Sequence, residues 1–96
     1  MPVTLINPFE VPKEVDDEQF LGGWQRAANY MRQQPGFLSS RLHRALASDA
    51  RFPFINVAEW ASPKDFQAAI ARAEFRAMAA DAGPSSPALY QVIRSF

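Results

Sequence analysis

Alternation of apolar and polar residues at the start of the chain predicts a β-strand from Val3 to Val11, closed by Pro12. Pro8 lies inside this segment and cannot donate a ladder hydrogen bond, which indicates an edge position or a local bulge. One face of the strand carries four apolar residues and one amide: Val3, Leu5, Asn7, Phe9 and Val11.

The period then changes to three and four residues, which predicts an amphipathic helix from Asp16 to about Gln34. Gly22-Gly23 weakens its first turns by roughly 1 kcal/mol per glycine relative to alanine, and small residues there would also let a ligand or another backbone approach. Pro35-Gly36 ends the helix. The apolar stripe consists of Phe20, Trp24, Ala27 and Met31.

Two further strands are predicted at Phe37 to Leu46 and Phe52 to Trp60, joined by a turn at residues 47–50 as a hairpin. Strict alternation would divide the first of them into two faces: Leu38, Leu42 and Leu46 on one, and Phe37, Ser39, Arg41 and His43 on the other. Apolar side chains occur on both faces of the hairpin. Burial on two sides points to a homodimer that packs sheet on sheet.

A second helix is predicted to begin at Ser62-Pro63, with serine as N-cap and proline in the first turn. Phe75 and Met78 extend it after a possible break, and Gly83-Pro84 ends it. Pro87 to Phe96 supplies the last strand. The order strand, helix, strand, strand, helix, strand predicts one α+β domain over residues 1–96, a ferredoxin-like βαββαβ fold with two helices on one face of an antiparallel sheet.

Composition narrows the possible functions. Ten basic and ten acidic residues balance, which argues against bulk attraction to nucleic acid or to an anionic membrane. The absence of cysteine excludes disulfides, thiolate metal sites and cysteine nucleophiles, and a single histidine excludes a multi-histidine metal centre within one chain. No secretion signal or membrane-spanning run is apparent, so a cytoplasmic protein is the expectation.

The candidate chemistry lies in polar residues within apolar faces. Asn7 lies between Leu5 and Phe9 in the alternation, and Asn56 shares its face with Trp60. A buried asparagine left unpaired costs roughly 1–3 kcal/mol, so each amide either satisfies backbone groups or faces a ligand. A lone histidine such as His43 is more often structural or solvated than catalytic.

Four segments and their spacing resemble the antibiotic biosynthesis monooxygenase domain over nearly the whole chain. The glycine-phenylalanine after the first helix and the tryptophan at the end of the third strand are the most telling marks. The segments are Ile6 to Pro12, Gln34 to Phe37, Ser40 to Arg44 and Phe54 to Trp60, followed by Ser62-Pro63, Phe66 and Phe75.

The resemblance implies a homodimeric α+β barrel with a pocket between the sheet and helices of each subunit. Cofactor-free members of the family oxidise phenols or quinols with molecular oxygen, and the asparagine and tryptophan expected in their pocket match Asn56 and Trp60. The tyrosine expected six residues later is Phe66. Heme-degrading members use an asparagine and a tryptophan that match Asn7 and Trp60, but their iron-binding histidine falls at about Ala79, which cannot ligate iron.

The favoured hypothesis is therefore a monooxygenase without cofactor or metal that acts on a small phenolic, quinol or polycyclic aromatic substrate. Asn56 and Trp60 would be its catalytic donors. A non-catalytic dimeric ligand-binding or scaffold domain is the alternative, and an open rather than a filled pocket would favour the enzyme. Heme binding without turnover is a third possibility. The candidate substrate-binding residues are Asn7, Phe54, Phe66, Met78 and His43.

Overall fold

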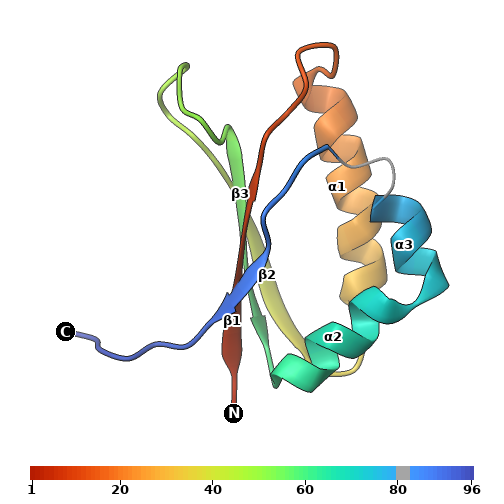
Figure 1. Cartoon of the computed structure of the whole chain (residues 1–96), viewed down its shortest axis with the longest axis vertical. Helices are drawn as coiled ribbons and strands as arrows, with labels where there is room; N and C mark the ends of the chain where they lie inside the picture. The colour runs from red at the N-terminus through yellow and green to blue at the C-terminus, as the bar shows by residue number, and fades with distance from the viewer. Residues whose placement is uncertain (80–82) are drawn as a thin grey trace.

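The chain folds as a four-stranded antiparallel sheet with three helices on one face (Figure 1). The computed structural model describes residues 1–79 and 83–96. The order of the strands in the sheet is β2-β3-β1-β4, which confirms the predicted ferredoxin-like α+β class. The elements are β1 (Val3–Phe9), α1 (Asp17–Met31), β2 (Phe37–Arg44), β3 (Phe54–Trp60), α2 (Pro63–Ala71), α3 (Ala73–Ala79) and β4 (Ala88–Tyr90).

Side-chain caps fix where the longer helices begin. Asp16 accepts a hydrogen bond from the Gln19 backbone N–H, and the Gln19 side chain accepts one from the Asp16 N–H, forming a capping box before α1. Ser62 caps α2 by accepting from the Asp65 N–H, as predicted. The predicted second helix is divided at Arg72, whose ψ of 145° is extended. Its expected end at Gly83-Pro84 adjoins residues 80–82, which lie outside the described part.

The core forms where β1 and β3 pair beneath the helices. Leu5 is directly opposite Ala58, and both are buried. Because opposed residues of antiparallel strands share a face, the strands present Leu5, Ala58 and Trp60 together to the helices. Phe66 and Ala69 of α2 complete this buried cluster.

A β-bulge changes the facing of β2 from what strict alternation predicts. Phe37 pairs with Trp60, but Ser39 pairs with Glu59, so Leu38 is the extra residue. Phe37 therefore lies on the helix side of the sheet with Ser40 and Leu42, and not with Ser39, Arg41 and His43 as expected from alternation. One added residue moves every later side chain of the strand to the opposite face of the sheet, relative to the residues before it.

The strand ends correct two other expectations. Tyr90 pairs with Thr4 in the last pair of the β1–β4 register, so residues 92–96 extend past Val3, the first residue of β1, and the predicted strand to Phe96 is reduced to Ala88–Tyr90. β1 is an inner strand, although Pro8 predicted an edge or a bulge. Proline is tolerated because Pro8 lies beyond the residues that β4 pairs, and its carbonyl accepts from the Ser86 N–H.

The second face of the sheet carries no helix (Figure 1). Ile6, Ile55 and Val57 lie on it, half-buried, together with exposed His43. Among the helices that the structure describes, none is long and apolar enough to cross a membrane.

Candidate functional site

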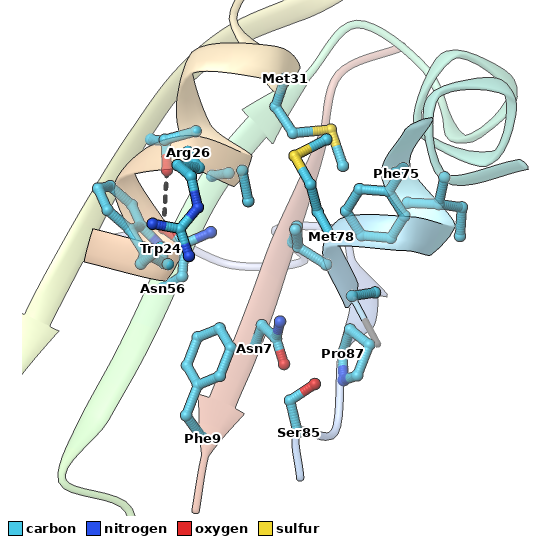
Figure 2. Close-up of a pocket in the computed structure, with 18 of the residues that line it drawn as sticks. Asn7, Phe9, Trp24, Arg26, Met31, Asn56, Phe75, Met78, Ser85 and Pro87 are labelled. Atoms are coloured by element: carbon cyan, nitrogen blue, oxygen red, sulfur yellow. Dashed lines mark hydrogen bonds between the residues drawn. The ribbon is translucent and has the colours of Figure 1, made fainter. Parts of the chain in front are cut away.

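A cavity of about 590 Å³ lies between the sheet and the helices. That volume is within the usual range for sites that bind small molecules. Figure 2 shows Met31 from α1 and Phe75 and Met78 from α3 facing the strand that carries Asn7. The walls are mostly apolar, and include Leu5, Phe9, Phe20, Trp24, Ala27, Met31, Phe66, Ile70, Phe75 and Met78.

Two asparagines lie side by side in the sheet wall of this cavity. Asn7 of β1 and Asn56 of β3 are opposed in the register, and both line the cavity. The Ser40 hydroxyl of β2 donates a hydrogen bond to Asn56 Oδ1, with 2.7 Å between the two oxygen atoms (Figure 2). Since the hydroxyl occupies the amide oxygen, the –NH₂ end of Asn56 is the end left for a ligand.

Two buried polar atoms lack any hydrogen-bond partner in the described structure: Asn7 Oδ1, an acceptor, and Trp60 Nε1, a donor. Leaving such an atom unpaired costs roughly 1–3 kcal/mol. Both residues line the cavity. A ligand with a hydrogen-bond acceptor for the indole N–H and a donor for the amide oxygen would satisfy both atoms.

Trp60 is held rigidly. Its side chain is 1% exposed, and its ring makes edge-on contacts with Phe37 at 5.4 Å and Phe66 at 5.6 Å between centroids. Edge-to-face packing of this kind fixes ring orientation. The bulge makes it possible, because it directs Phe37 to the helix side. The indole N–H is thus a preorganised donor.

The cavity contains almost no ionisable groups. No Asp, Glu, His, Lys, Tyr or Cys lines it in the described ranges 1–79 and 83–96, and Arg26 is the one charged lining residue there. Within the same ranges, no three His, Cys, Asp or Glu residues are placed to hold a metal ion. The described part of the lining can therefore donate and accept hydrogen bonds, but it offers no carboxylate or imidazole base.

The structure brings five of the seven sequence-predicted residues to one cavity: Asn7, Asn56, Trp60, Phe66 and Met78. Phe54 does not line it; its ring stacks on Phe20 at 4.5 Å, behind the wall. His43 is exposed and paired with Ile55, on the face without helices. Neither Phe54 nor His43 is therefore part of the candidate site in this cavity.

Among the cavity residues that were not anticipated from the sequence, Ser40 and Arg26 matter most for the site. Ser40 was assigned no role, because only the bulge brings it to the face of Asn56. Arg26 flanks the apolar stripe of α1 one turn after Gly22-Gly23. A basic residue close to a glycine pair is the feature of the sequence that could have indicated a cavity residue here. Ala79, where heme-degrading relatives are expected to have histidine, does line the cavity. Its methyl group cannot ligate iron, so the donor set does not fit heme held in that way.

The family model for antibiotic biosynthesis monooxygenase matches residues 2–81, and the chain belongs to this family. A search of curated proteins finds no match. Among solved structures, a candidate monooxygenase from Shewanella loihica PV-4 is 41% identical, with a TM-score of 0.86 and coverage of 98% of this chain and 96% of that one.

SnoaB, a cofactor-independent oxygenase from Streptomyces nogalater, is 26% identical with a TM-score of 0.83, over 98% of this chain and 95% of its own. A hydroxynitrile lyase from Passiflora edulis shares the fold at 12% identity and a TM-score of 0.81, over 99% and 96%. The family and the oxygenase neighbours support a monooxygenase-type function, while the lyase shows that the fold also hosts other chemistry.

Proposed function

We propose that this protein is a cofactor-independent monooxygenase that oxidises a phenolic, quinol or polycyclic aromatic substrate with molecular oxygen. One observation carries the proposal: an open apolar cavity in which Asn7 Oδ1 and Trp60 Nε1 are buried without partners beside the Asn56 amide. A flat aromatic ring suits the apolar walls, and a hydroxyl group on the ring would supply hydrogen bonds that the unpaired atoms lack.

In a monooxygenase reaction, the phenolate would transfer one electron to dioxygen, giving a phenoxyl radical and superoxide. Their recombination forms a C–O bond at the carbon para to the hydroxyl. The resulting peroxide loses water as the O–O bond breaks, so phenol plus O₂ gives quinone plus water. A hydroquinone would instead give quinone plus hydrogen peroxide.

The protein's part is to favour the anionic substrate and to hold it. The Asn56 –NH₂ group and the Trp60 N–H can both donate to the phenolate oxygen, and preorganised donors act strongly in a site that excludes water. Asn7 Oδ1 would accept a hydrogen bond from the hydroxyl group of a neutral substrate as the substrate enters the cavity. Because the described lining has no base, the hydroxyl proton leaves to solvent.

The test is oxygen uptake by purified, metal-free protein with a panel of anthrones and hydroquinones. We expect saturable uptake whose kcat falls about 100- to 1,000-fold in Asn56→Ala and Trp60→Phe, the range for loss of one oxyanion donor. Asn29→Ala is the matched control, since Asn29 is exposed on α1 and outside the cavity lining. Equal uptake by all four proteins would contradict the proposed site.

A ligand-binding protein without turnover is the second candidate, and the base-free cavity is the observation that favours it. It predicts that aromatic ligands bind to the cavity with no oxygen uptake above the uncatalysed rate for any substrate. The filled-pocket form of a scaffold domain does not agree with an open volume of about 590 Å³.

A further inference from the structure

Arg26 is the one charged side chain among the lining residues that the structure describes. It lies on α1, is solvent-exposed as a residue, and still lines the cavity, so it belongs to the part of the lining that meets solvent. Figure 2 shows its side chain beneath α1. Three groups deeper in the site, the amides of Asn7 and Asn56 and the indole of Trp60, are uncharged. A guanidinium at the rim therefore divides the site into a neutral interior and a cationic entrance.

The glycine pair makes room for this guanidinium. A Cβ built on Gly22 would lie 3.8 Å from Arg26 Nη1, and one on Gly23 would lie 3.7 Å from Nη2. The side chain thus folds back over the preceding turn of its own helix, against two residues without side chains. At both positions a Cβ would make only an ordinary van der Waals contact with the guanidinium, so alanine is accommodated there and only a larger side chain would reach it.

No carboxylate neutralises Arg26 in the described part of the chain. The ion pairs found there join Arg44 to Asp17, Arg51 to Glu10 and Arg72 to Glu74. A guanidinium presents a planar fork that matches a carboxylate in two parallel hydrogen bonds.

We propose that Arg26 is a specificity residue that binds a carboxylate carried by the aromatic ligand. The inference rests on the proposed function for the identity of the ring, and it narrows the substrate class to aromatic acids. The ring occupies the apolar cavity while its carboxylate stays at the wet rim, where desolvation is small.

Binding of inert ligands tests this without turnover. The probes are three acid and amide pairs of increasing size: benzoate, 2-naphthoate and anthraquinone-2-carboxylate, each beside its carboxamide. Calorimetry gives the Kd, and fluorescence quenching locates the ligand, since the two tryptophans, Trp24 and Trp60, both line the cavity. The proteins are the natural chain, Arg26→Gln, Arg26→Lys and Arg32→Gln. Arg32, the exposed C-cap residue of the same helix, lies outside the described lining and is the control.

We expect at least one acid to bind about tenfold more tightly than its amide at low salt, with the advantage shrinking as salt rises. Arg26→Gln should abolish the advantage and leave the affinity for the amide unchanged. Arg26→Lys should keep part of it, because an ammonium has the charge without the fork. Arg32→Gln should behave as the natural chain.

Three results would overturn the inference: no acid binds better than its amide, Arg26→Gln weakens both ligands equally, or Arg32→Gln loses the advantage as well. The outcome is separable from the proposed reaction. An acid preference that depends on Arg26 without any oxygen uptake supports this subsite and contradicts the oxidation. Oxygen uptake that is the same for substrates with and without a carboxylate would support the oxidation and contradict this subsite.

Discussion

At the scale of single residues, the site depends on one hydroxyl that orients one amide. Ser40 Oγ donates to Asn56 Oδ1, and both atoms belong to strands that the bulge aligns. Without that hydroxyl the amide would be free to turn its oxygen toward the ligand. Ser40 is in this sense a positioning residue, and Asn56 is the group that would meet substrate.

Ser40→Ala should therefore lower kcat about three- to tenfold, since one net hydrogen bond is worth about 1 kcal/mol. KM should change less, because apolar contacts with the ring remain. Steady-state oxygen uptake measures both constants. Ser40→Thr keeps a hydroxyl and should restore most of kcat, while Ser39→Ala, on the opposite face and exposed, should leave it unchanged. A Ser40→Ala enzyme with the natural kcat would show that the amide is oriented by other means.

Asn7 is a residue at which stability and the proposed activity oppose each other. Its Oδ1 is buried without a partner, so Asn7→Leu, close in shape, should raise the free energy of unfolding by about 1 kcal/mol. The same change should lower kcat/KM, as it removes an acceptor from the cavity. Urea unfolding and oxygen uptake measure the two effects.

Thr4→Val on the same strand is the comparison for Asn7→Leu. The Thr4 hydroxyl already donates to Glu59, at 3.0 Å, so removing it should give no gain in stability. An Asn7→Leu protein that is less stable than the natural chain would mean that the amide is satisfied in solution.

At the scale of elements, two glycines of this chain should respond to alanine in opposite directions. Gly36, between α1 and β2, has φ of +86°, and a Cβ there would collide with the Asp65 side chain. Gly22 is within α1, and its nearest contact for a Cβ is an ordinary 3.8 Å to Arg26. The tight turn requires glycine, whereas the helix merely tolerates it.

Gly36→Ala should destabilise the fold by more than about 1–2 kcal/mol, the cost of a left-handed conformation before any clash. Gly22→Ala should stabilise it by up to about 1 kcal/mol through helix propensity. Chemical denaturation of both variants measures the difference. Equal effects of the same sign would contradict the role assigned to the turn.

The elements also show how far the sequence alone reaches. Periodicity and caps were sufficient for the helices and for three strands, because the capping and hydrophobic signals are local. They placed Asn56 and Trp60 on one face correctly, since β3 has no irregularity. The bulge at Leu38 has no sequence signal, so the facing of Phe37 and the role of Ser40 could not be foreseen. Likewise the alternation of residues 87–96 did not show that β4 ends at Tyr90, because the end of a strand depends on where its neighbour β1 begins, at Val3.

At the scale of the whole molecule, the sheet has one covered and one uncovered face (Figure 1). The uncovered face carries Ile6, Ile55 and Val57. Exposed Val92 and Ile93 follow β4, at 77% and 74% exposure. Apolar side chains left on an uncovered sheet face are typical of an interface. We therefore expect the homodimer predicted from the sequence, packed through this face.

Sedimentation analysis should then give a dimer at micromolar concentration. Val57→Lys, which places a charge at the centre of the face, should shift it to monomer. Gln67→Lys adds the same charge on the exposed side of α2 and should remain dimeric. A natural chain that sediments as a monomer would refute the expectation, as would a Val57→Lys protein that stays dimeric.

The pH dependence of the reaction also belongs to the whole molecule, because the fold decides which titratable groups reach the cavity. In the described lining Arg26 is the one charged group, and no carboxylate or imidazole is present. If the substrate reacts as its phenolate, the rate rises with pH through the substrate's own hydroxyl pKa. The profile of kcat/KM should show one rising limb with its midpoint at the pKa of the free substrate. The midpoint of kcat should be lower, because the N–H donors of Asn56 and Trp60 favour the bound anion.

Two hydroquinones whose hydroxyl pKa values differ test this directly. The midpoint of kcat/KM should move between them by the full difference in their pKa values, since no group of the protein sets it. Asn56→Ala should bring the kcat midpoint back toward that of the free substrate, because one donor to the anion is lost. A bell-shaped profile, or a midpoint that is the same for both substrates, would instead identify a titrating group of the protein as the base. In that case the proton would not leave to solvent, and the base would have to be a residue outside the described lining.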